Sequence, residues 1–199
     1  FVVPNHLLEQ MAGDIKHLYP TANILAATKK DSAAANRQQL MARIATGQWD
    51  AVVVTHTAFE KLKLSEQAQT NFLAEEYAKV REAILSVKGR GEESRRVMKD
   101  LEKKKSSLQE RINAIAESPA KDNTITFEQL GIDLLLIDES HYFKNLGYVT
   151  KMRSIAGLPN TESKRAFDMH MKVRYMAEVR GEGKGVIFAT GTPIANSMA

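Results

Sequence analysis

The 199-residue chain contains no cysteine, which excludes a disulfide framework and any thiolate-ligated metal site. It also lacks an apolar run near the roughly 18 residues that a membrane-spanning helix needs, and it shows no signal peptide. We therefore expect a cytoplasmic location and no membrane partner. Aromatic residues are few, at 7%, but hydrophobic residues make up 43% of the chain, which is enough for one domain with a sizeable core.

A strong charge of either sign is missing as well. The 28 lysine and arginine residues outnumber the 24 aspartate and glutamate residues, so the formal net charge is only +4. A mild basic excess is compatible with a polyanionic partner such as nucleic acid, but many basic proteins bind none. Composition therefore leaves the partner open, and the motifs along the chain must decide it.

Short apolar segments alternate with helical patterns along most of the chain. The apolar segments show no polar alternation, which is typical of strands buried on both faces of a parallel sheet. Helical patterns at 6–19, 32–47 and 161–183 lie between them. This order predicts an α/β domain whose mostly parallel sheet is flanked by helices. The predicted strands are 1–3, 23–28, 51–55, 133–138 and 185–190.

Residues 65–118 interrupt this alternation with two long amphipathic patterns, which the glycine-containing turn 88–93 separates. Apolar residues recur at steps of four and three in both patterns, as in the seam between paired helices. We predict an inserted antiparallel helical hairpin that divides the domain into 1–64 and 119–199. Basic residues exceed acidic ones near its tip, so three interpretations stand: a structural arm, a contact for a phosphate backbone, or a contact for another protein.

Asp138 and Glu139 directly follow the apolar segment 134–137, so they lie at the carboxyl end of a predicted strand. Ligands of open α/β sheets bind beyond this end of the strands. One carboxylate there can hold a hydrated Mg²⁺, and its neighbour can position or deprotonate a water that attacks a γ-phosphate. The pair is therefore a candidate nucleoside triphosphatase site, with an ordinary strand cap as the alternative interpretation.

The sequence around this pair resembles a family of nucleic-acid motors. The letters DESH at 138–141 resemble the Asp-Glu-x-His box of superfamily-two helicases, and DESHYFKN at 138–145 is similar to the Swi/Snf-type DNA-translocating ATPases. That family carries a Thr-Gly-Thr-Pro motif on the next strand, which ATGTPIAN at 189–196 resembles. The stretch SKRA at 163–166 is similar to the family's Ser-Lys-x-x-x-Ala helix.

Two earlier stretches extend the resemblance to nearly the whole chain except the hairpin. FVVPNHLLEQMAGDI at 1–15 resembles the family's motif Ia, and DAVVVTHTAFEKL at 50–62 resembles the strand and turn that follow it. The stretches THTAFEKL and DESHYFKN also resemble sequences of the large helicase–methyltransferase proteins of phages and other mobile elements. The motifs occur in the order that the family has.

The resemblance implies a RecA-like first lobe that binds ATP and Mg²⁺ and moves on duplex DNA. By this resemblance Asp138 ligates Mg²⁺, and Glu139, which also contributes to nucleotide binding, activates the attacking water. Four residues are expected to couple the state of the nucleotide to movement: His141, Thr190, Gly191 and Thr192. Five residues are expected to lie nearest to the nucleic acid: Pro4, Asn5, Thr55, His56 and Lys144.

The chain departs from the family pattern in one respect. It contains no Gly-x-x-x-x-Gly-Lys-Ser/Thr loop, and GEGKGV at 181–186 has the wrong spacing. We expect that the piece is N-terminally truncated and that the loop and a second RecA-like lobe belong to the same parent chain. On this expectation the 199 residues alone do not hydrolyse ATP. A sheet without its phosphate-loop strand also has an unpaired edge, which invites a dimer with a second copy.

The function predicted from the sequence is ATP-driven translocation on DNA by the intact parent. Two alternatives remain at this point. A helicase that separates DNA or RNA strands carries the same Asp-Glu-x-His box, although the Lys144-Asn145 pair argues against it. A RecA-like module that binds nucleic acid or serves assembly without hydrolysis would carry the same fold.

Overall fold

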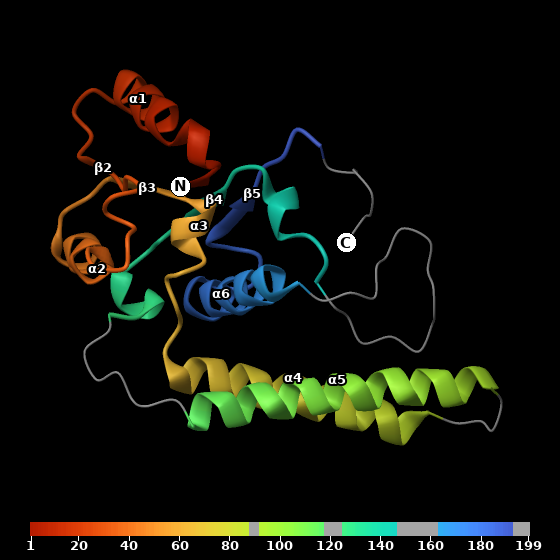
Figure 1. Ribbon diagram of the computed structural model, residues 1–199. Helices are drawn as coiled ribbons and strands as arrows, with labels where there is room; N and C mark the ends of the chain where they lie inside the picture. The colour runs from red at the N-terminus through yellow and green to blue at the C-terminus, as the bar shows by residue number, and fades with distance from the viewer. Residues whose placement is uncertain (88–91, 118–124, 147–162, 193–199) are drawn as a thin grey trace.

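The computed structural model describes residues 1–87, 92–117, 125–146 and 163–192. These residues form a five-stranded sheet with strand order β2-β3-β1-β4-β5, in which all neighbouring strands are parallel (Figure 1). The predicted α/β class and parallel sheet are confirmed, and the architecture is consistent with a RecA-like fold. The strands are β1 Val2–Val3, β2 Ile24–Ala26, β3 Ala51–Thr55, β4 Leu135–Ile137 and β5 Val186–Phe188.

Helices connect the strands and cover the sheet. The α-helices are α1 Leu8–Leu18, α2 Arg37–Thr46, α3 His56–Phe59, α4 Glu66–Ser86, α5 Glu92–Ala116 and α6 Lys164–Arg180. Three short 3₁₀ helices are η1 Asn5–Leu7, η2 Phe127–Leu130 and η3 Ser140–Phe143. Helix α2 begins later than the predicted residue 32, because the Asp31 carboxylate accepts hydrogen bonds from the backbone and hydroxyl of Thr28 and so stabilises a turn there.

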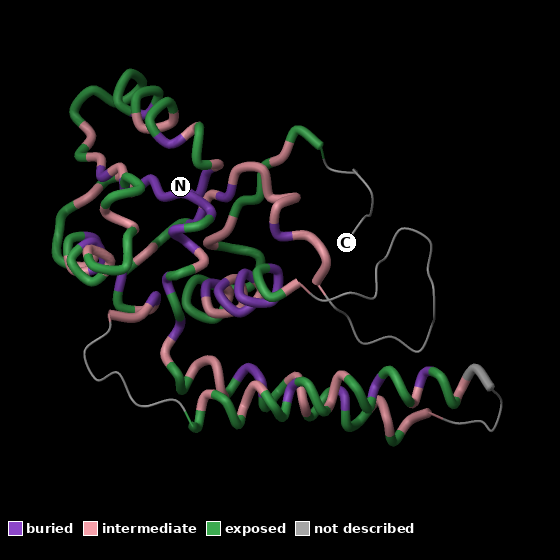
Figure 2. The backbone as a smooth tube through the Cα atoms, in the orientation of Figure 1, coloured by how far each residue is buried: buried purple, intermediate pink, exposed green. Residues whose placement is uncertain are grey.

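The two faces of the sheet are covered unequally. Helix α1 packs on one face, where Leu8 and Ile15 meet Val3 and Val53. The other face carries the larger core, to which α2, α3, α6 and the α4–α5 pair all contribute. Both residues of β1 are 1% exposed, so this central strand is buried on both faces, as its unbroken apolar sequence predicts (Figure 2).

Helices α4 and α5 form the predicted hairpin, and they lie side by side as an arm below the sheet in Figure 1. The seam between them is apolar and buried, as the heptad spacing predicts. Three basic residues of α5, Arg95, Lys99 and Lys103, are exposed and follow one another at steps of four. The arm's role as a structural element, a contact for a phosphate backbone or a contact for another protein stays a prediction. The buried seam residues are Leu73, Val80, Val97, Leu101 and Leu108.

Hydrogen bonds close the base of the arm where it leaves and rejoins the domain. The Glu128 carboxylate accepts bonds from the Ser65 backbone N–H at 2.9 Å and from the Ser65 hydroxyl at 2.7 Å. Burial raises the pKa of Glu128, but these bonds outweigh it, and the pKa lies below its usual value. The Phe127 N–H also donates to the Lys63 carbonyl at 2.8 Å. The arm is thus anchored at both of its ends.

A buried lysine joins α6 to the rest of the domain. Lys172 is 0% exposed, and its ammonium donates to Asp168 Oδ2 at 2.6 Å and to the Phe59 carbonyl at 2.9 Å. Lys63, at the base of the arm, binds the other oxygen of Asp168 at 2.8 Å. Burial lowers the pKa of Lys172 to about 8, although Asp168 opposes this shift. Asp168 and Lys172 together therefore connect α6 to the end of α3 and to the base of the arm.

Strand β5 lies at the edge of the described sheet. Its residues Ile187 and Phe188 are 50% and 51% exposed, whereas Ile137 on β4, which pairs with Phe188, is fully buried. An edge strand of this kind can accept another strand, and the dimer expected from the sequence stays a prediction. In the part of the chain that the structure describes, no helix is both long and apolar enough to cross a membrane.

Replacing Lys172 by alanine is expected to lower the free energy of unfolding by about 3 kcal/mol, because a buried ion pair loses one partner. Urea denaturation of the 199-residue chain measures this loss. Lys164→Ala, at the exposed first residue of the same helix, is the matched control. A loss below about 1 kcal/mol, the size of an ordinary substitution, would contradict the role given to Lys172.

The pH dependence of stability tests the same lysine. The folded-state pKa lies near 8 and the ordinary value is 10.5, so the unfolded chain binds more protons between these values. The contribution of Lys172 to the free energy of unfolding therefore rises with pH across this interval. The difference in stability between the native chain and Lys172→Met is expected to shift in favour of the native chain over that range. A constant difference would show that the pKa is not depressed.

Candidate functional site

The carboxyl ends of the central strands meet at one edge of the sheet, and backbone hydrogen bonds extend their pairing past the strand ends. The Asp138 N–H donates to the Val2 carbonyl at 2.9 Å, and the Ala189 N–H donates to the Ile137 carbonyl at 2.8 Å. The Ser140 N–H then donates to the Ala189 carbonyl at 2.9 Å. These bonds hold the start of the loop after β4 between its two neighbouring strands.

Glu139 has a left-handed backbone conformation, with φ of 48° and ψ of 52°. Residues other than glycine adopt it at a cost, so it persists only where neighbouring contacts enforce it. Here the hydrogen bonds of Asp138 and Ser140 to strands on either side enforce it. The chain turns sharply at Glu139 and enters η3 directly, and its carboxylate reaches residues that follow β5.

A polar cluster forms between the loop after β4 and the segment after β5. His141 Nδ1 lies 2.9 Å from Glu139 Oε2 and 3.1 Å from each of the Thr190 and Thr192 hydroxyls. The Thr190 hydroxyl donates to Glu139 Oε2 at 3.2 Å and accepts the Thr192 N–H at 3.1 Å. The structure thus brings together Glu139, His141, Thr190 and Thr192, which the sequence named from separate motifs.

Gly191 contributes less to this cluster than its two threonine neighbours do. A Cβ built at Gly191 would meet no atom within 4 Å, so the space around it does not require glycine. Residues 193–196, which are the second half of the ATGTPIAN stretch and include the proline of the Thr-Gly-Thr-Pro motif, lie outside the described residues. The coupling role predicted for Gly191 therefore gains no support from a contact.

The carboxylates suit a metal ion that is held mainly by other ligands. Asp138 is partly exposed at the strand end, and among the described residues no donor binds its carboxylate. The described part of the chain also contains no cluster of three or more histidine, cysteine, aspartate or glutamate residues that could hold a metal alone. Mg²⁺ commonly takes one or two protein carboxylates and completes its shell with phosphate oxygens and water. The donor set at Asp138 and Glu139 fits that pattern.

Two loops that the sequence assigned to nucleic acid lie against each other. The Thr57 hydroxyl donates to Asn5 Oδ1 at 3.2 Å, which joins the loop after β3 to the start of η1. Thr57 and Asn5 are exposed, and Pro4 is half-buried. The sequence did not single out Thr57, because one hydroxyl in a polar turn carries no distinctive pattern.

The side chains of Thr55 and His56, which the sequence expected to lie nearest to nucleic acid, are both buried. Thr55 is 8% exposed, and its hydroxyl caps α3 by accepting the Ala58 N–H at 3.2 Å. His56 is 4% exposed, and its Nε2 lies 2.8 Å from the Asp138 carbonyl. Both side chains turn inward because each satisfies a backbone group there. Lys144 ends η3, and the structure records no contact between its side chain and the described residues of these loops.

Aromatic and basic groups extend from His56 toward α6. The His56 ring stacks on Tyr142 at 4.6 Å between centroids, and the Arg165 guanidinium lies 4.1 Å from the Tyr142 centroid. Burial lowers the pKa of His56, although its contact with the Asp138 carbonyl raises it, so the ring is neutral near pH 7. Burial, followed by the nearby Glu60 carboxylate, raises the pKa of Tyr142. We call Arg165, Tyr142 and His56 the stacked column.

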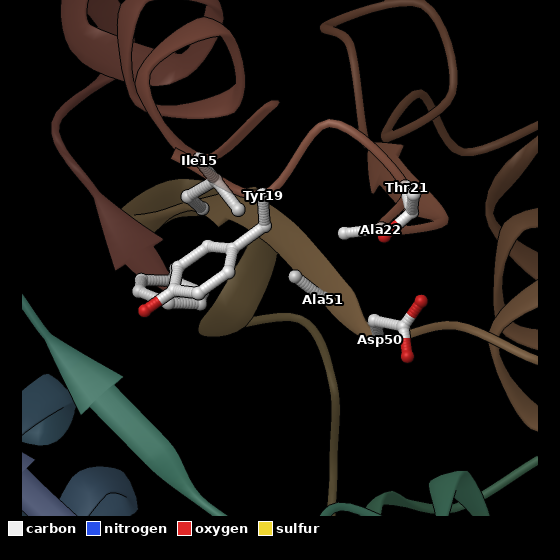
Figure 3. Close-up of a pocket in the computed structure, with 7 residues that line it drawn as sticks. Ile15, Tyr19, Thr21, Ala22, Asp50 and Ala51 are labelled. Atoms are coloured by element: carbon white, nitrogen blue, oxygen red, sulfur yellow. The ribbon is translucent and has the colours of Figure 1, made fainter. Parts of the chain in front are cut away.

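Hollows also exist at the opposite edge of the sheet, where the strands begin. One pocket of about 350 Å³ is lined by Ile15 and Tyr19 of the α1 region and by Asp50 and Ala51 at the start of β3 (Figure 3). Its carboxylate is already engaged, because Asp50 Oδ2 accepts the Asn23 N–H at 2.7 Å. Ligands of parallel sheets bind at the carboxyl ends of strands. This pocket is therefore a weaker candidate than the edge that carries Asp138.

A comparison with protein families gives the site its context. A family model described as a probable helicase domain matches residues 5–199, which is nearly the whole chain. The chain belongs to this helicase-domain family. No curated protein and no solved structure matched it. Membership in the helicase-domain family agrees with the motif order of the sequence at this coarse level. It does not identify the helicase subtype, the nucleotide that is bound, or the nucleic acid on which the protein acts.

Replacing Thr190 of the helicase domain by valine is expected to lower the free energy of unfolding by about 1 kcal/mol, because Glu139 loses a donor and the Thr192 N–H loses its acceptor. Thr190→Ser keeps the hydroxyl and should restore the stability. Urea denaturation of both variants measures the difference. Equal stability of the valine and serine variants would show that the polar cluster is not formed in solution.

Proposed function

We propose that this chain is the first RecA-like lobe of an ATP-dependent motor that moves on duplex DNA. The observation that carries the proposal is the link between strand ends: Glu139, beside Asp138 after β4, is joined through His141 to Thr190 after β5. A motor needs such a link, because the state of the nucleotide has to alter residues that are remote from the phosphates. The helicase-domain family and the α/β fold support the proposal at a coarser level.

The proposed chemistry assigns different tasks to the two carboxylates. Asp138, whose carboxylate has no donor among the described residues, would hold Mg²⁺, which when bound neutralises charge on the ATP phosphates. Glu139 would orient the attacking water and accept its proton. His141 and Thr190 engage only Oε2 of Glu139, and among the described residues no donor binds Oε1, which leaves that oxygen for the water.

Catalysis would also need groups that this sequence does not contain. A glycine-rich loop with a lysine would cradle the β- and γ-phosphates, and an arginine from a second lobe would stabilise the transferred phosphoryl group. We propose that the polypeptide in which this domain works supplies both. The DESHYFKN and ATGTPIAN stretches support a Swi/Snf-type motor of a mobile element, which translocates on duplex DNA instead of separating its strands.

In the full-length polypeptide, Glu139→Gln is expected to retain ATP binding and to lower ATP turnover at least about 100-fold, since the amide cannot accept the proton of the water. Phosphate release and binding of a fluorescent ATP analogue measure the two quantities. Glu178→Gln, an exposed residue near the end of α6, is the matched control. Turnover that survives Glu139→Gln would show that the catalytic assignment is wrong and would favour a module that binds without hydrolysing.

The 199-residue chain alone is expected to show no ATP turnover above roughly 1 per second with duplex DNA present, because the phosphate-binding groups are not part of it. Phosphate release from the purified chain tests this expectation. A strand-displacement assay of the full-length polypeptide on forked DNA distinguishes translocation on duplex DNA from strand separation. Strand displacement there would replace translocation on duplex DNA by strand separation as the function.

A further inference from the structure

His56 stands at the junction between the proposed nucleic-acid loops and the proposed Mg²⁺ ligand. It is the first residue of α3, and it lies between Thr55, which caps that helix, and Thr57, which bonds to the exposed Asn5. Its ring points the other way and reaches the Asp138 carbonyl, 82 positions along the chain, at 2.8 Å. A single residue thus belongs to the loop that faces solvent and contacts the backbone of the proposed Mg²⁺ ligand.

The direction of this hydrogen bond follows from its chemistry. A carbonyl oxygen only accepts, so His56 Nε2 must carry a proton and donate it to Asp138. The ring cannot swing away easily, because it stacks on Tyr142 and meets Phe143 edge-on at 5.3 Å between centroids. Burial of the side chain, at 4% exposed, also removes water as an alternative partner for Nε2.

The carbonyl that His56 binds belongs to a short and constrained segment. The N–H of the same residue, Asp138, donates to Val2, and the next residue, Glu139, has the left-handed conformation. A shift of the Asp138 backbone would therefore change the direction of both carboxylates together. Partners that orient the residues around a metal typically alter metal affinity or activity by 10- to 100-fold when they are removed.

We propose that His56 is a positioning residue that transmits contact between nucleic acid and the Asn5–Thr57 loops to the backbone of Asp138. Displacement of Thr57 by a bound phosphate backbone moves the start of α3, and His56 carries that movement to the metal-binding carboxylate. Within the stacked column, Tyr142 and Arg165 restrict the His56 ring, so that it moves together with its own backbone. This inference rests on the proposed function of the site.

The test uses the full-length polypeptide with His56→Phe, which keeps the aromatic packing and removes the donor. The ratio of DNA-stimulated to basal ATP turnover is expected to fall about tenfold, and the Mg²⁺ concentration for half-maximal turnover to rise about tenfold. Affinity for duplex DNA should stay unchanged, because the ring does not reach the surface. His56→Gln, whose side-chain amide can donate to Asp138, should recover part of both losses.

His170→Phe is the matched control, since this half-buried histidine on α6 also packs edge-on against an aromatic ring, Phe72, at 5.2 Å between centroids. It should behave as the native protein does. The inference would be overturned if His56→Phe left unchanged both the stimulation by DNA and the Mg²⁺ concentration for half-maximal turnover. A variant that lost only DNA affinity would overturn it as well. If His56→Phe melts early, the NMR measurement that follows decides instead, because it uses the native chain.

A second measurement works on the 199-residue chain without ATP. Long-range ¹H–¹⁵N NMR is expected to show His56 protonated at Nε2, and an Nδ1–H tautomer would overturn the inference because the bond to Asp138 could not exist. The proposed function fails separately, and takes this inference with it, if the native full-length polypeptide shows no ATP turnover that depends on Glu139. If the native polypeptide hydrolyses ATP and His56→Phe shows the same DNA stimulation and Mg²⁺ requirement, the inference about His56 is wrong while the proposed function stands.

Discussion

The parallel backbone pairing of β1, β4 and β5 is the constraint on which the site depends. It continues past the strand ends through Asp138 and Ala189, so loops from distant parts of the sequence are held in one register. The left-handed turn at Glu139 exists because this pairing enforces it. Side-chain contacts between Glu139, His141 and Thr190 are then a consequence of backbone geometry instead of its cause.

A second, polar anchor lies beneath the sheet. Lys172 and Asp168 are charged residues inside an otherwise apolar core, and they connect α6 to α3 and to the arm. Such pairs are costly to desolvate, and their value lies in fixing one arrangement of the elements that they join. Helix α6 also supplies Arg165 to the stacked column, so its placement bears on the edge of the sheet that carries Asp138 and Glu139. The core and the site therefore share one helix.

Much of the fold was predictable, and the failures have physical reasons. Unbroken apolar segments identified all five strands, and the heptad spacing identified the arm, because burial leaves a periodic record in sequence. Asp138 and Glu139 were singled out because they follow a buried strand, and their roles stay predictions. The burial of His56 was not predicted, since a polar Thr-His-Thr turn is typical of a surface loop until the partner of its ring is known. Lys172 was missed because a lysine four residues after an aspartate is typical of an exposed helix face.

The closed base of the arm has a consequence for how such a domain can change over evolutionary time. Ser65 and Glu128 bind each other directly, so the two ends of the insertion stay adjacent whatever lies between them. Loop-closure entropy grows only slowly with length once the ends are held together. Lineages could therefore lengthen, shorten or recharge α4 and α5 with little effect on the sheet, and the insertion is the natural place for a helicase domain of this family to acquire new partners.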